Sequence, residues 1–297
     1  MRKIRLYFPM KGKDTNYAAS SQPPFTSPRL RTVRPYDVLE RRARGGQRPG
    51  LRRMYEQILG VYADLSEYTS LQAFWRMEEL DPTGGSATVK DSANSHDATP
   101  NEKLASVEGP VGRAIRFDGD SQFLDCGASN DFSLATAFTI NAWMRPNTMD
   151  MEAILSWYDS ATSDYVLLAQ GVYAPPPGGT EPFTVTFDIN GTTAVRQVYL
   201  PRTDFRMVTA SYDGTDMRVY LNGSLVGDPH AYAGGFSTSA DKILIGKFIS
   251  GTELWLAADL CNVMLFNEAL TAEQVADLYA NIGSPIVAMG QITTVKQ

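Results

Sequence analysis

Apolar and polar residues alternate along much of the chain beyond about residue 70, and a period of two is typical of a β-strand. The alternation is clearest in residues 138–144, where Phe138, Ile140, Ala142 and Met144 fall on one face. We therefore expect a half-buried strand there. The same pattern predicts further strands at residues 71–78, 153–157, 165–170, 183–189, 243–247, 254–258 and 260–266.

Turn signals separate these strands at short intervals. Asn-Gly pairs at positions 190–191 and 222–223 predict two-residue hairpin turns, because both turn residues must adopt a positive φ. Near the C-terminal end, an amphipathic stretch predicts a helix over 272–281, begun by a capping box between Thr271 and Gln274. Many short strands separated by turns predict an antiparallel β-sandwich.

Three stretches of the chain resemble the laminin G-like, concanavalin A-like superfamily of jelly-roll domains. They are residues 113–146 with an FDG turn and an FTINAW strand, residues 206–227 with YDGT and VYLNG, and the turn VKDSANSHDAT at 89–99. The resemblance covers roughly residues 71–282. It implies a mainly β fold, a two-sheet antiparallel jelly-roll sandwich of the concanavalin A type.

The N-terminal part of the chain differs in charge from the rest. Residues 1–53 hold 14 lysines and arginines against three acids, a balance of +11, whereas the remainder holds 13 against 30, a balance of −17. We expect the basic part to be extended, with short helices. The predicted parts are a basic N-terminal anchoring arm (1–69), a jelly-roll domain (70–283) and a C-terminal tail (284–297).

Within the arm, residues 33–55 (VRPYDVLERRARGGQRPGLRRMY) resemble N-terminal segments of tailed-phage structural proteins. The resemblance implies a non-enzymatic structural protein of a phage virion, a capsid decoration or a neck or tail appendage, made in the host cytoplasm. The arm would bind other virion proteins, so the chain would be part of an oligomer in the assembled particle. The expected contact residues are Arg34, Tyr36, Arg41, Arg44, Arg48 and Arg52.

Nucleic acid is not the expected partner of the arm, because the acidic remainder of the chain would repel a phosphate backbone. The alternative function is a lectin-like carbohydrate-binding adhesion module whose ligands are host-surface glycans. Such a site needs aromatic and polar groups in a concavity. Aromatic residues that could supply it, or could equally fill the core, are Trp157, Tyr158, Tyr165, Tyr173, Tyr232 and Phe236. The sequence assigns none of them to a carbohydrate.

Hydrolytic chemistry is not expected. Retaining glycoside hydrolases need two carboxyl groups ~5 Å apart, and the nearest approach to such a pair is Glu78, Glu79 and Asp81, where a strand runs into a Pro-Gly loop. His96 and His230 lie in predicted turns, away from any serine or cysteine nucleophile motif. We therefore expect no catalytic residues and no enzymatic activity.

Calcium is the metal that the resemblance suggests, and no other cofactor is expected. Asp118, Asp120 and Asp125 surround a glycine turn, and carboxylate oxygens are ligands that Ca²⁺ prefers. The family often carries a pair of acids where this chain has Cys261 and Asn262, which weakens the calcium prediction.

The two cysteines, Cys126 and Cys261, lie in apolar strand-like segments, so we expect buried free thiols rather than a disulfide. The sequence lacks the ~18 consecutive apolar residues of a membrane-spanning helix. No apolar run follows the basic N-terminal residues, so a secretory signal is not expected either.

Overall fold

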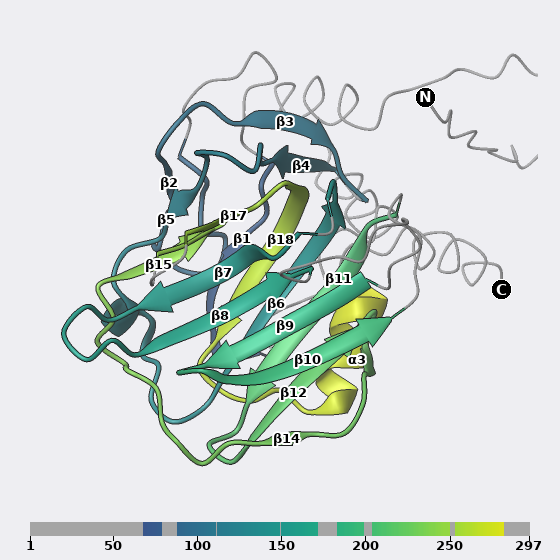
Figure 1. Ribbon diagram of the computed structural model, residues 1–297. Helices are drawn as coiled ribbons and strands as arrows, with labels where there is room; N and C mark the ends of the chain where they lie inside the picture. Colours follow the sequence, from purple (N-terminus) through teal and green to yellow (C-terminus); the bar gives the residue numbers. More distant parts are fainter. Residues whose placement is uncertain are drawn as a thin grey trace, which may run out of the picture. The chain divides into compact units, whose positions relative to one another are not determined.

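In a computed structural model of the protein, two antiparallel β-sheets pack face to face, and one α-helix lies against the outer face of the larger sheet (Figure 1). The structure describes residues 68–78, 88–110, 112–148, 150–171, 183–198, 204–249 and 253–281. The prediction of a mainly β, concanavalin A-like jelly-roll sandwich is confirmed. The limits of the arm, domain and tail stay predictions, because almost all of the arm and the whole tail lie outside these residues.

The larger sheet has nine strands, and β6 and β18 lie at its centre. Its main path runs in the order β13 (Ser224–Leu225), β12 (Asp216–Leu221), β11 (Arg206–Tyr212), β6 (Phe138–Pro146), β18 (Ala258–Phe266), β4 (Arg113–Arg116) and β3 (Ala105–Glu108). Two further strands pair off this path, β1 (Leu71–Trp75) with β18 and β14 (His230–Ala231) with β12. His230 therefore lies in a short strand and not in the predicted turn.

The smaller sheet has seven strands and lies in front of the larger one in Figure 1. Its order is β10 (Thr192–Val198), β9 (Phe183–Ile189), β8 (Tyr165–Gln170), β7 (Glu152–Tyr158), β15 (Lys242–Ile245), β5 (Leu124–Asp125) and β2 (Thr99–Pro100). A separate hairpin is formed by β16 (Lys247–Phe248) and β17 (Leu254–Trp255). The short strands β5 and β2 therefore form one edge of the smaller sheet.

The main core lies between the two sheets and follows the predicted alternation. Phe138, Ile140, Ala142 and Met144 of β6 are all fully buried. The ring of Phe138 crosses the gap between the sheets and lies 4.8 Å, centroid to centroid, from the ring of Trp157 on β7. Burial of such side chains is the main driving force for the packing of two sheets.

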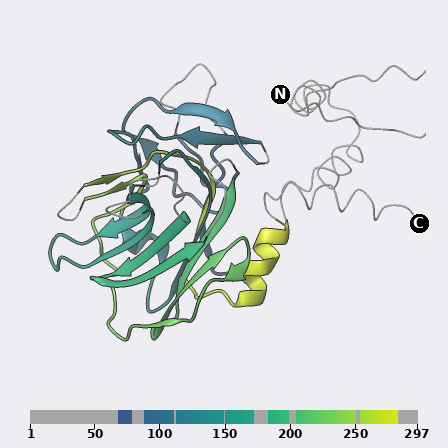
Figure 2. The ribbon, with the colours of Figure 1, turned by 45° about the vertical axis from the view of Figure 1, so that its right-hand side comes forward.

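The opposite face of β6 is buried as well, so the prediction of a half-buried strand was wrong. Helix α3 (Ala272–Asn281) and the chain before it cover this face (Figure 2). Tyr279 stacks on Trp143 with 5.6 Å between ring centroids and 10° between ring planes. The hydroxyl of Thr139 donates to the carbonyl of Glu268 at 2.8 Å. The helix thus occupies the side that the alternation assigned to solvent.

The predicted helix start is confirmed by two hydrogen bonds. The N–H of Thr271 donates to Oε1 of Gln274 at 2.8 Å, and the N–H of Gln274 donates to Oγ1 of Thr271 at 3.2 Å. This reciprocal pair is a capping box. The hairpin turns are confirmed too, since the residues at 190–191 and 222–223 have φ between +50° and +83°. Among the described helices, none is long and apolar enough to cross a membrane.

Candidate functional site

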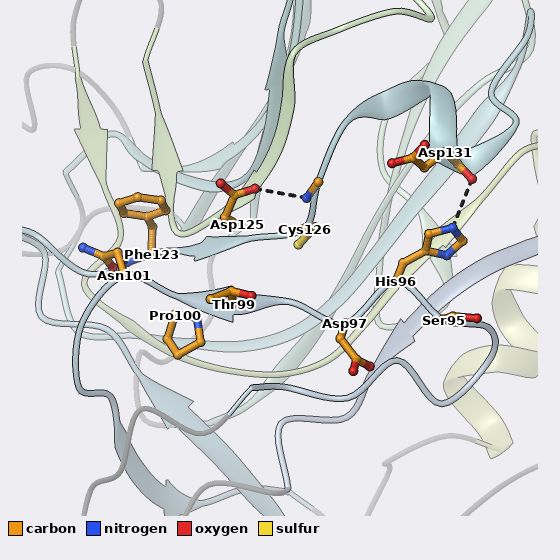
Figure 3. Close-up of a pocket in the computed structure, with 11 residues that line it drawn as sticks. Ser95, His96, Asp97, Thr99, Pro100, Asn101, Phe123, Asp125, Cys126 and Asp131 are labelled. Atoms are coloured by element: carbon orange, nitrogen blue, oxygen red, sulfur yellow. Dashed lines mark hydrogen bonds between the residues drawn. The ribbon is translucent and has the colours of Figure 1, made fainter.

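A cavity of about 600 Å³ opens at the edge of the smaller sheet formed by β2 and β5. Its eleven lining residues come from 95–101, 123–127 and Asp131, the last on the short 3-10 helix η2 (Ser129–Phe132). Figure 3 shows the lining residues, which come from segments that are separate in the sequence. Most of them are polar or charged.

The pairing of β2 with β5 positions the residues at the floor of the cavity. Thr99 lies directly opposite Asp125 in the β2–β5 ladder, and paired residues project to the same face of a sheet. After Asp125 the chain turns at Gly127, where φ is +91°. The N–H of Gly127 donates to Oδ1 of Asp125 at 3.0 Å and fixes this carboxylate (Figure 3).

The loop at 91–97 forms one wall and is organised by the buried side chain of Asp91. Its Oδ1 accepts hydrogen bonds from the N–H groups of Phe74 at 2.8 Å and Ala93 at 2.9 Å. Its Oδ2 accepts from the N–H groups of Asn94 at 3.0 Å and His96 at 3.1 Å. Four donors on one carboxylate fix the loop against β1, because leaving buried N–H groups unpaired is costly.

His96 joins this loop to η2. Its Nδ1 lies 3.1 Å from the carbonyl oxygen of Gln72 on β1, and its Nε2 lies 3.0 Å from the carbonyl oxygen of Asp131 (Figure 3). Its ring lies 4.3 Å from that of Phe132. Because both ring nitrogens contact backbone carbonyls, His96 shapes the wall and does not present a free nitrogen for acid-base chemistry.

Three carboxylates line the cavity, and their surroundings differ. Asp97 pairs with Lys90, whose hydrogen bond, together with one from the N–H of Asp91, holds the pKa of Asp97 below its ordinary value. Asp125 pairs with Lys242 at 2.5 Å. Asp131 has no cationic partner among the described residues. With the exposed hydroxyls of Ser95 and Thr99, these groups can exchange hydrogen bonds with a polyhydroxyl ligand.

Cys126 also lines the cavity, but it is only 4% exposed. Burial raises the pKa of its thiol well above the ordinary value, with the charges of Asp125 and Asp91 acting in the same direction. The thiol therefore stays protonated and is a poor nucleophile. Both cysteines are buried and free, which confirms that prediction.

The predicted arm contacts cannot be placed. Arg34, Tyr36, Arg41, Arg44, Arg48 and Arg52 all lie outside the described residues. Of the acids considered for hydrolysis, Glu78 lies just beyond the end of β1, while Glu79 and Asp81 are outside the described residues.

Two of the three calcium candidates make other interactions. Asp118 closes its own turn, since its Oδ1 accepts from the N–H groups of Asp120 at 3.0 Å and Ser121 at 3.2 Å. Asp125 belongs to the cavity and pairs with Lys242. Across the part of the chain that the structure describes, no three acidic, histidine or cysteine side chains are grouped as a metal site would require. Calcium binding stays a prediction.

Most of the candidate aromatic residues belong to packed clusters. Trp157 is buried against Phe138, and Phe236 packs on both at 5.9 and 4.8 Å between ring centroids. Tyr232 lies 5.6 Å from Tyr212, and Tyr165 lies 5.1 Å from Phe248. Tyr173 is outside the described residues, and Tyr158 is half-buried on β7. None of the five described candidates lines the cavity.

No pattern in the sequence singled out Ser95, Asp97, Thr99, Phe123 or Asp131 as site residues. The available signal was the turn at 89–99, which was identified only as a family motif, and the repeated acids on both sides of Gly127. What the sequence could not supply was the pairing of β2 with β5, which brings these segments together.

Comparisons with known proteins give a family match and a set of structural likenesses. A laminin G-type family model, described as the concanavalin A-like lectin/glucanases superfamily, matches residues 118–276. No curated protein matches the sequence.

Among solved structures, domain 4 of an extracellular arabinanase from Geobacillus stearothermophilus, in complex with arabinotriose, is similar with a TM-score of 0.54 and 15% identity over 71% of this chain and 98% of that domain. A mutant of Trypanosoma rangeli sialidase displaying trans-sialidase activity gives a TM-score of 0.55 and 12% identity. That match covers 86% of this chain but only 39% of the sialidase. At these identities the likeness shows the fold alone.

Proposed function

This chain belongs to the concanavalin A-like lectin/glucanases superfamily, and on that premise we propose that its sandwich is a carbohydrate-binding module whose ligand occupies the cavity around Asp97, Asp125 and Asp131. The observation that carries the proposal is the cavity itself. Its volume of about 600 Å³ lies within the range of ligand sites in proteins, ~300–1,000 Å³.

The chemistry of the lining supports a sugar ligand. Sugar hydroxyls donate hydrogen bonds, and the carboxylates of the cavity accept them; the hydroxyls of Ser95 and Thr99 can do both. Phe123, which is partly exposed, adds apolar surface for the C–H face of a sugar ring. The arabinanase domain with the same fold was solved in complex with arabinotriose, which makes an oligosaccharide a reasonable first class of ligand to test.

The test begins with a glycan array probed with the full-length protein, followed by calorimetry of each ligand found. Thr99→Val removes a hydroxyl from the cavity and keeps the side-chain shape. We expect it to weaken binding about five- to tenfold, the equivalent of one hydrogen bond of ~1 kcal/mol. Thr136→Val is the matched control, because Thr136 is exposed and lines no part of the cavity.

The outcomes separate the parts of the proposal. If no glycan binds, the carbohydrate function is wrong. If a glycan binds but Thr99→Val and Thr136→Val behave alike, the ligand occupies another surface. We further propose that the module does not hydrolyse what it binds; new reducing ends in mass spectra of a bound oligosaccharide after incubation would contradict this.

A second candidate function, attachment to a virion, rests on the charge division of the sequence. A +11 arm joined to a −17 remainder favours an arm that binds an acidic partner. To test this, the full chain and a version lacking residues 1–53 would each be mixed with virions, and the amount that sediments with the virions would be compared. We expect only the full chain to be retained, and equal retention of both would contradict attachment through the arm.

A further inference from the structure

Among the described residues, the lining of the cavity contains three carboxylates and no lysine or arginine. Lys90 and Lys242 lie nearby, but each pairs with an aspartate of the lining, Asp97 and Asp125 respectively, and both lysine side chains are more than half exposed. A third lysine, Lys247, has its Nζ 5.3 Å from the centre of the Phe123 ring and pairs with Glu253 at 3.3 Å. In the described lining and among these lysines, a ligand carboxylate or sulfate would therefore find no unpaired cation.

Asp131 adds a negative charge to the cavity that no neighbouring cation in the described part of the chain balances. It is exposed, it belongs to η2, and no cation pairs with it among the described residues. Its backbone carbonyl contacts His96, whereas its carboxylate points away from His96 (Figure 3) and lies near Gly127 of the lining. Asp91, buried behind the same wall, adds a further negative charge whose oxygens are already occupied by backbone N–H groups.

We propose that the cavity selects neutral and amino sugars and rejects acidic ones, an inference that rests on the proposed carbohydrate function and defines its ligand class. The physical reason is that like charges repel strongly at short range where water is partly excluded. Specificity of this kind comes from a repulsive element as much as from attractive contacts. An ammonium group of an amino sugar would instead gain an ion pair with Asp131.

The test uses the full chain and a neutral oligosaccharide found on the array. The same oligosaccharide, with its primary hydroxyls oxidised to carboxylates, is the acidic probe. At low salt we expect the acidic probe to bind at least tenfold more weakly than the neutral one. The difference should shrink at high salt, since exposed charges are then screened. An amino-sugar oligomer of the same linkage should bind at least as tightly as the neutral one.

Asp131→Asn tests the residue that we hold responsible. It should lower the ratio of the two dissociation constants, acidic probe over neutral probe, by at least threefold. The dissociation constant of the neutral probe should change by a smaller factor. Asp277→Asn is the control, because it removes the same charge from an exposed position on α3, which contributes nothing to the cavity. Melting temperatures of both variants would establish that each is folded.

Two failures can be told apart. If no glycan binds, the proposed function fails and this inference fails with it. If glycans bind but the acidic probe binds as tightly as the neutral one, or if Asp131→Asn leaves the discrimination unchanged, the inference alone is overturned and the carbohydrate function stands.

Discussion

Glu152 is a carboxylic acid that is 5% exposed at the start of β7. Its Oε2 accepts hydrogen bonds from the N–H of Ala257 at 2.9 Å and from Nε2 of Gln170 at 2.7 Å. Its Oε1 accepts from the hydroxyl of Thr148. Burial raises the pKa of Glu152 above its ordinary value, and these hydrogen bonds offset only part of the effect.

The raised pKa predicts how Glu152→Gln affects stability. The folded state holds this proton more tightly than the unfolded state, so the contribution of Glu152 is most favourable at low pH and is lost as pH rises through its folded pKa. Glutamine keeps the acceptor for Ala257 and Gln170 and can donate to Thr148. We expect the variant to match or exceed the wild type at pH 7, by up to ~1 kcal/mol.

Urea unfolding at pH 7 and below about pH 4 would check this, because the wild-type carboxyl is neutral at the lower pH and the advantage of glutamine should shrink there. Glu108→Gln on the edge strand β3, where the side chain is exposed, is the control. A Glu152→Gln variant that loses stability at pH 7 but not at the lower pH would contradict the assigned cause. No local pattern indicated this burial, since Glu152 only begins an ordinary apolar strand in the sequence.

Helix α3 is the element whose existence was easier to predict than its role. Its limits and capping box followed from residues adjacent in the chain, and both are confirmed. That it covers β6 did not follow, because the contacts between Tyr279 and Trp143 and between Thr139 and Glu268 join distant parts of the sequence. The alternation of apolar and polar residues in a strand indicates which residues share a face. It does not indicate whether a second element packs on that face.

This packing predicts a large effect of Leu278→Ala. Leu278 is 1% exposed on the inner side of α3, and truncating a buried leucine typically costs 2–5 kcal/mol, roughly. We expect the free energy of unfolding to fall by about that amount in urea titrations. Asp277→Ala, one position earlier and exposed, should change it far less. Equal effects of the two substitutions would mean that α3 does not stabilise the sheet.

At the scale of the whole molecule, the described residues contain both sheets and the helix that covers the larger one. We therefore expect residues 68–283 to fold without the preceding part of the chain. Circular dichroism should show a β-dominated spectrum, and the melting temperature should lie within a few degrees of that of the full chain. A fragment that unfolds without a cooperative transition would contradict this expectation.

The fold was predictable from the sequence, whereas the cavity was predictable only in part. The fold followed from recurring turns and strand patterns, and Asp125 was singled out, although for calcium. Asp97, Thr99 and Asp131 were not connected with it, because they meet only once β2 pairs with β5 and His96 joins the 91–97 loop to η2. Side chains that converge through pairing between non-adjacent strands leave no periodic signal in the chain.

The position of β1 has a mechanical consequence. The chain from residues 1–67 enters the described structure at Tyr68, three residues before β1 begins. The carbonyl of Gln72 on β1 accepts from Nδ2 of Asn94 at 2.7 Å and faces Nδ1 of His96 at 3.1 Å. Tension between a ligand in the cavity and the N-terminal chain would therefore pass through the 91–97 loop into the first residues of β1.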